Sequence, residues 1–137
     1  MKTSVLAAGV AVFVAALTVG CGGGGSSTPT TPTTPPVTGG GSDTATITIG
    51  TDGRVSPATV TITRGGRVTF VNNHNQAHDM SSDPHPEHSD CPEVNQVGFL
   101  TAGQSRTTGN LNTARTCGFH DHNQPSNTGL QGRITIQ

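Results

Sequence analysis

The histidines are the residues of this chain best suited to chemistry. All six lie within residues 74–122, so one segment carries the imidazoles that could bind a metal ion. In the run His120-Asp121-His122, an extended backbone would place both imidazoles on the same face. The spacing of His85 and His88 is compatible with metal binding. Because they lie in a proline-rich polar stretch, however, we expect them to be solvated surface residues rather than primary ligands.

The N-terminal residues read as an export signal. Lys2 precedes an uncharged apolar stretch, residues 4–19, which is short for a membrane span and ends in small residues, as secretory signals do. The sequence LTVGC, residues 17–21, resembles the bacterial lipobox, although Thr18 stands where leucine is usual. We therefore predict a signal peptide over residues 1–20 and a lipid on Cys21 that anchors the exported protein to a membrane of the cell envelope. The alternatives are an ordinary signal peptide with an incidental cysteine and an uncleaved signal anchor.

A linker separates this anchor from the folded domain. Residues 22–43 (GGGGSSTPTTPTTPPVTGGGSD) contain almost nothing that a core could bury, so they cannot offset the entropy of ordering themselves. A random-coil estimate gives the linker an r.m.s. reach of about 25 Å. The segment 21–43 is therefore interpreted as a tether, and residues 44–137 as the single folded domain.

The domain has the composition of a β protein. Short runs of Val, Ile and Thr alternate with polar residues, turn residues separate the runs, and no helix is predicted. We expect Arg64-Gly65-Gly66 to be a turn, and residues 72–95 have no periodicity. The expected strands cover residues 44–49, 55–63, 67–71, 97–100, 105–111, 113–119 and 132–137. The formal net charge is −1, which gives no basic surface for a nucleic acid.

The order of these segments resembles that of the plastocyanin-like cupredoxins. The resemblance covers nearly all of the domain, and its elements follow one another in the family's order. They are residues 57–62 (PATVTI), Gly66, residues 68–73 (VTFVNN), His78, residues 102–105 (AGQS), residues 117–120 (CGFH) and residues 132–136 (GRITI). The resemblance implies an all-β, cupredoxin-like Greek-key β-sandwich of seven or eight strands, with one copper ion at one end.

The resemblance also implies a ligand set. By position, His78, Cys117 and His120 would be the equatorial copper ligands, two imidazoles and a thiolate. The family's axial methionine has no counterpart, because Pro125 occupies its position. Candidates for the further or axial ligand are His122, Met80, Gln124 or a backbone carbonyl.

Cys117 has a second interpretation. An exported domain with two cysteines usually pairs them, here as a Cys91–Cys117 disulfide. In that case copper loses its thiolate, and His78, His120 and His122 would form a nitrogen-only site. The family position of Cys117 favours the thiolate. His74 is expected to be a turn residue.

These observations predict a copper-binding, non-enzymatic protein, a monomeric one-electron carrier that is tethered to a membrane and serves an unidentified redox partner. The alternatives are copper storage, delivery or sensing without electron transfer, and a metal-free surface β-sandwich that contains the Cys91–Cys117 disulfide.

Overall fold

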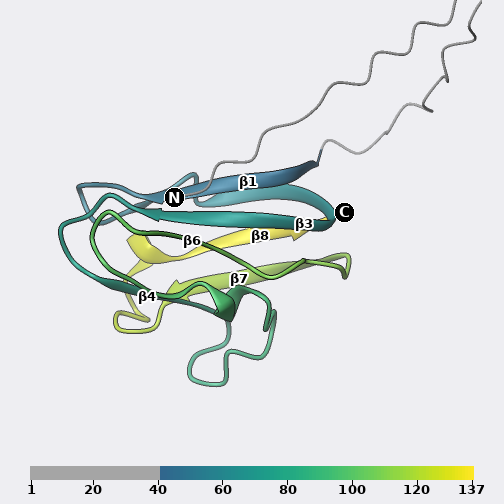
Figure 1. Ribbon diagram of the computed structural model, residues 1–137. Helices are drawn as coiled ribbons and strands as arrows, with labels where there is room; N and C mark the ends of the chain where they lie inside the picture. The colour runs from purple at the N-terminus through teal and green to yellow at the C-terminus, as the bar shows by residue number, and fades with distance from the viewer. Residues whose placement is uncertain (1–40) are drawn as a thin grey trace, which may run out of the picture. The chain divides into compact units, whose positions relative to one another are not determined.

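The computed structural model describes residues 41–137, which form a β-sandwich of eight strands with two 3₁₀ turns (Figure 1). The predicted signal peptide, Cys21 and nearly all of the linker lie outside the described residues. No helix within residues 41–137 is long and apolar enough to cross a membrane. The strands are β1 (Ser42–Ile49), β2 (Val55–Ser56), β3 (Thr59–Asn72), β4 (His78–Ser82), β5 (Gly98–Leu100), β6 (Ser105–Thr107), β7 (Arg115–Asp121) and β8 (Gly132–Ile136), and the 3₁₀ turns are η1 (Val94–Gln96) and η2 (Thr128–Leu130).

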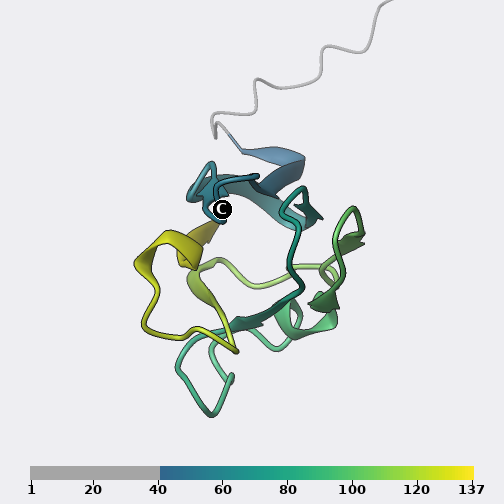
Figure 2. The same ribbon diagram turned by 90° about the vertical axis from the view of Figure 1, so that its left-hand side faces the viewer.

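The strands are connected as in a Greek-key sandwich, with the hydrogen-bonded order β2-β1-β3-β8-β7-β4-β5 and β6 paired to β3. In Figure 1, β1 and β3 lie along one side of the domain, and β4 and β7 lie along the other. In the end view of Figure 2 the strands are arranged around the middle of the domain. The pairs β1–β3 and β3–β8 are parallel, whereas β8–β7, β7–β4 and β4–β5 are antiparallel.

The long strand β3 joins the two layers. Its first part pairs with β8, from Thr59 to Ile62, and its second part pairs with β1 and β6. The expected turn at Arg64-Gly65-Gly66 is instead a bulge within this strand, because the register moves from Ser42↔Ile62 to Thr44↔Arg67. Gly65 has a φ of 83°, which only glycine adopts readily, so the chain bends here without leaving the sheet.

Alternating apolar side chains build the core between the layers. Ile47 and Ile49 of β1 are fully buried, as are Phe70 of β3 and Phe119 of β7. The two phenylalanine rings meet edge to face, with centroids 5.1 Å apart and planes at 87°. This contact packs β7 against the opposite layer. It lies next to the histidine-containing residues that follow Phe119 in the sequence.

Strand β4 lies in the segment for which no strand was expected. Its sequence HDMSS buries His78, Met80 and Ser82, so the inward positions carry polar as well as apolar residues and the usual alternation is hidden. β4 pairs with β7 in the register Met80↔Asp121 and Ser81↔His120. Because side chains alternate across a strand, His120 points to the face opposite that of Asp121.

Candidate metal centre

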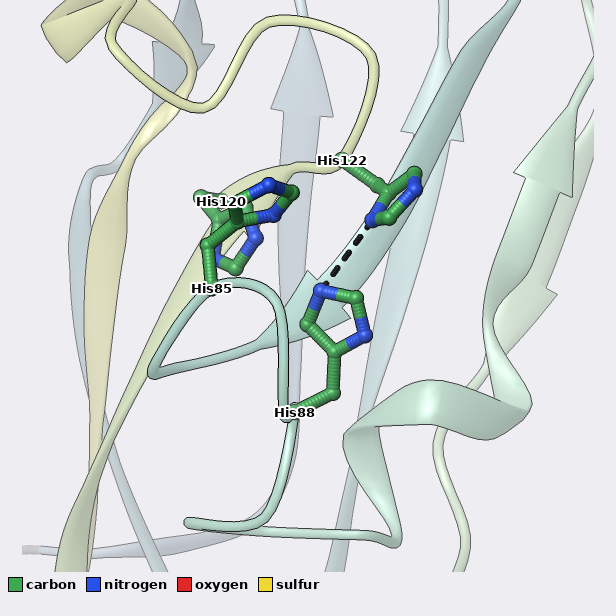
Figure 3. Close-up of side chains that lie close together, drawn as sticks. All are labelled: His85, His88, His120 and His122. Carbon is green, nitrogen blue, oxygen red and sulfur yellow. Dashed lines mark hydrogen bonds between the residues drawn. The ribbon is translucent and has the colours of Figure 1, made fainter.

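Four imidazoles converge where β7 ends. The ring nitrogens available for coordination, one each from His85, His88, His120 and His122, all lie within 4.8 Å of one another. Figure 3 shows that His85 and His88 come from the loop after β4, whereas His120 and His122 come from the end of β7. The group combines one deeply buried ring, His120, with the exposed ring of His85, and it is therefore reachable from solvent.

Backbone and side-chain hydrogen bonds hold the loop against β7. The N–H of Asp83 donates to the carbonyl of Gly118 at 3.0 Å, and the N–H of Gly118 donates to the Asp90 carboxylate at 3.2 Å. Asn95 donates from Nδ2 to the carbonyl of His88 at 2.8 Å and accepts from the N–H of Ser82 at the same distance. The loop therefore has fixed ends and a fixed middle, although its regular structure is limited to the short 3₁₀ turn η1.

Asp83 sets the orientation of His120. Its Oδ1 lies 2.7 Å from Nδ1 of His120, and a carboxylate can only accept, so Nδ1 carries the proton. Nε2 of His120 is buried and has no hydrogen-bond partner within the described residues. A carboxylate on one imidazole nitrogen with the other nitrogen free is the arrangement that supports metal-bound histidine. An ion bound in the cluster would satisfy this buried atom.

Gly118 leaves room for this carboxylate. A Cβ at residue 118 would overlap the carboxylate of Asp83, which crosses β7 at this point to reach His120. Any larger residue would displace Asp83, so the glycine is part of the geometry of the site.

The surroundings of His88 disfavour the charged form of its imidazole. Its pKa is lowered by burial first and then by the neighbouring rings of His120, His122 and His85, against an opposing contribution from Asp79. Its Nε2 lies 3.1 Å from Nδ1 of His122. Since metal ions bind the neutral imidazole, the lowered pKa favours coordination. The residue has a φ of 50°, in the left-handed region, so the loop turns sharply at His88.

The two cysteines form a disulfide, Cys91–Cys117, with Cα atoms 5.8 Å apart. The prediction that Cys117 supplies a copper thiolate is therefore wrong, because a sulfur bonded to another sulfur carries no thiolate charge. The alternative prediction of a Cys91–Cys117 disulfide is confirmed. Both cysteines are fully buried, and the bond fastens the histidine loop to β7.

The structure also separates the predicted ligands. The cluster contains His120 and His122, but His78 is not part of it. Nδ1 of His78 instead lies 2.7 Å from Oδ2 of Asp121, and its Nε2 lies 2.9 Å from Nδ1 of His74. Met80 is buried in the apolar core.

His85 is exposed, as expected of a surface residue, and His88 is half-buried, but both belong to the cluster, which their position in a polar loop did not predict. The pairing of the cysteines could have revealed this. Cys91 follows His88 by three residues and Cys117 precedes His120 by three, so the disulfide brings the two histidine pairs together.

Solved structures with the same architecture are cupredoxins. A purple cupredoxin from Nitrosopumilus maritimus matches with a TM-score of 0.52 and 19% identity, over 68% of this chain and 99% of its own. The domain has the cupredoxin fold. The oxidised form of plastocyanin from Dryopteris crassirhizoma matches this domain with a TM-score of 0.53 and 18% identity, over 67% of this chain and 99% of its own. Reduced auracyanin from Roseiflexus castenholzii matches with a TM-score of 0.53 and 18% identity, over 72% of this chain and 99% of its own. No family model matches the sequence, and no curated protein matches it at a significant level.

The residues of this domain do not fit a thiolate copper site built from His78, Cys117 and His120, because Cys117 is bonded to Cys91. They do fit copper in another way. Imidazole is a good copper ligand, and four nitrogen donors suit the tetragonal preference of Cu(II).

Proposed function

We propose that this domain binds copper through the imidazoles of His85, His88, His120 and His122, without a thiolate. The observation that carries the proposal is the convergence of these rings with His120, whose buried Nε2 has no hydrogen-bond partner among residues 41–137 and whose ring the Asp83 carboxylate orients. The metal centre is thus assembled from the loop after β4 and the end of β7.

Two arguments favour copper over other metals. Among divalent first-row ions, Cu(II) binds a given set of nitrogen donors most tightly. The cupredoxin fold supports the same choice, since a similar structure is an amicyanin variant with Cu(I) (TM-score 0.51, 13% identity). When bound, copper would supply a redox-active Lewis acid at the end of the sandwich.

The donor set favours copper acquisition, storage or delivery. An all-imidazole site on a loop, with His85 exposed, lets an ion enter and leave. A site for fast electron transfer would instead bury a thiolate in a rigid frame. In this role the protein holds copper and turns over no substrate.

A one-electron carrier is the second candidate function. It is favoured by the likeness to a mutant fern plastocyanin that has been solved in oxidised and reduced states (TM-score 0.54, 17% identity). The two candidates differ in kinetics. A carrier exchanges electrons rapidly and retains its metal, whereas a delivery protein gives its copper to a competing chelator within minutes.

The test is a Cu(II) titration of the apo protein with visible and EPR spectroscopy. We expect tight binding, nitrogen hyperfine coupling and no strong thiolate-to-copper charge-transfer band. The double variant His85→Ala/His88→Asn should bind Cu(II) at least tenfold more weakly. Asn suits the positive φ at residue 88. Ser89→Ala, on the same exposed loop, is the matched control and should bind as the wild type does. A strong charge-transfer band, or unchanged affinity in the double variant, would refute the four-histidine site.

We further propose that lipid on Cys21 holds this copper domain, as a monomer, at the outer side of a membrane, where an unidentified partner protein exchanges copper or electrons with it. The lipobox-like sequence before Cys21 supports this localisation. Mass spectrometry of the mature protein would reveal acyl chains on Cys21. Cys21→Ala should release the domain into the soluble fraction.

A further inference from the structure

His85 differs from the other three members of the four-histidine cluster in how its ring is held. The Asp83 carboxylate fixes the ring of His120, and a hydrogen bond of 3.1 Å joins the rings of His88 and His122. The imidazole of His85 makes no hydrogen bond to any other residue that the structure describes, and the only dashed line in Figure 3 joins His88 and His122. The ring of His85 is therefore the least constrained of the four.

The backbone around His85 is fixed, in contrast to its side chain. Pro84 and Pro86 flank the residue, and each proline ring locks its own φ. The carbonyl of Pro84 accepts from the N–H of His88 at 2.8 Å, which closes the turn that carries His85. The exposed ring packs against that of His122, with centroids 5.0 Å apart. Rotation about the side-chain bonds can therefore withdraw the ring from the cluster without breaking a protein hydrogen bond or moving the loop.

An imidazole ligand is harder to displace when its second ring nitrogen is hydrogen-bonded to the protein, because that partner holds the ring in place and raises its basicity. His120 has such a partner in Asp83. His85 has none among the described residues, and its ring faces solvent. Of the four histidines, it is the one that a competing donor replaces most readily.

We propose that His85 is the exchangeable ligand of the copper centre, and that a histidine side chain of a partner protein takes its place when copper is transferred. This inference rests on the proposed function. The exchange breaks one copper–nitrogen bond, to His85, and forms one, to the incoming imidazole. No electron or proton is gained or lost, because both imidazoles bind as neutral groups. The other three histidines hold the ion meanwhile.

The surroundings of His85 favour a neutral nitrogen donor on a protein. Nitrogen suits Cu(II), whereas thioether sulfur selects Cu(I). Residues 83–93 include four acidic side chains and no lysine or arginine, and one of these acids, Glu93, is paired with Arg115. The others repel an approaching carboxylate. The loop that carries His85 projects from the sandwich in Figures 1 and 2, so a second protein can reach it.

The first experiment adds ¹⁵N-labelled imidazole, which stands for the partner's side chain, to the copper-loaded full-length protein. EPR hyperfine coupling distinguishes the label from the ¹⁴N of the protein. His85→Ala should have coupling to three protein nitrogens and should take up one labelled ligand without losing copper. The wild type should require an imidazole concentration about tenfold higher or more, because His85 competes. Ser89→Ala, exposed on the same loop, should behave as the wild type, and acetate should have no effect.

His88→Asn distinguishes the position of His85 from any other vacancy in the cluster. His88 is half-buried, and Asn95 holds its carbonyl. This variant should not take up imidazole at the low concentration that suffices for His85→Ala, because the asparagine side chain fills part of the vacated space. Uptake at the same concentration in both variants would show that any vacancy is filled and would overturn the inference.

A second copy of this chain provides a histidine on a protein surface. Copper loaded on His85→Ala should pass to apo wild type about tenfold faster or more than to apo His85→Ala, since only the wild type offers the exposed imidazole. Mass spectrometry with ⁶³Cu on the donor measures this rate. Equal rates to the two acceptors would refute the exchange with a protein side chain.

The outcomes also separate this inference from the proposed function. Coupling to four nitrogens in the wild type, together with no uptake of labelled imidazole by His85→Ala, would overturn the exchange and leave the four-histidine site standing. A wild type without coupling to four nitrogens would refute both.

Discussion

Oδ1 of Asp83 lies 2.7 Å from Nδ1 of His120. The imidazole is 3% exposed and the carboxylate 49% exposed, so a solvent-facing acid controls a ring that is almost entirely buried. The hydrogen bond fixes which nitrogen of His120 is free for a metal, and it links the histidine loop to β7. The geometry of the four-histidine cluster therefore depends on a residue that is not itself a member of it.

Replacing Asp83 should weaken metal binding without unfolding the domain. In Asp83→Ala the ring of His120 loses its acceptor and its fixed tautomer, and we expect the Cu(II) affinity to fall about 10–100-fold. Glu87→Gln removes a negative charge from an exposed position on the same loop and serves as the control. Competition with a Cu(II) chelator measures both affinities. An equal loss in the two variants would mean that only the overall charge of the loop matters.

Gly118→Ala tests the same contact from the opposite side. The new methyl group would occupy the place of the Asp83 carboxylate, which must then leave His120. We expect an affinity loss of about tenfold or more, similar to that of Asp83→Ala. The double variant should be no worse than either single variant, because both remove one interaction. Gly109→Ala, where the atoms nearest to the methyl group belong to the movable amide end of Gln96, should leave affinity unchanged.

The fold could be predicted to a large extent from local patterns. The alternation in residues 44–49 and 132–137 corresponds to β1 and β8, and the order of turns and strands gave the sandwich. β4 could not be found in this way, because its inward positions are His78, Met80 and Ser82. The bulge in β3 was mistaken for a turn because Gly-Gly allows either, and only the pairing with β1 decides.

The histidine cluster was harder to predict because it depends on the face of the strand to which each side chain points. Cys117 and His120 are three residues apart in β7, so their side chains lie on opposite faces of the strand. Cys117 packs toward the core and binds Cys91, whereas His120 meets the loop histidines. The spacing C-x-x-H alone does not distinguish this arrangement from a loop in which both residues turn toward one ion.

Removing the disulfide should affect both stability and metal binding. The bond closes a sequence separation of 26 residues, for which loop-closure entropy corresponds to about 3.5 kcal/mol at 25 °C. We expect Cys91→Ala/Cys117→Ala to lose about this much unfolding free energy in urea denaturation. Its Cu(II) affinity should also fall, because the part of the loop that carries His85 and His88 then loses its covalent link to β7 and keeps its hydrogen bonds. Unchanged affinity in a variant that still folds would show that these hydrogen bonds suffice to position the loop.

The lowered pKa of His88 predicts how the stability of the apo protein changes with pH. Burial and the rings of His120, His122 and His85 disfavour the charged form in the folded state, whereas in the unfolded chain the group titrates near its ordinary value of 6.5. As the pH falls through this value, the unfolded chain takes up a proton that the folded domain resists, so stability is retained above about pH 6.5 and decreases below it. The Tm of apo protein between pH 8 and pH 5 measures this slope. His88→Asn, which suits the φ of 50°, should have a shallower slope, and identical slopes would exclude His88 as a source of the effect.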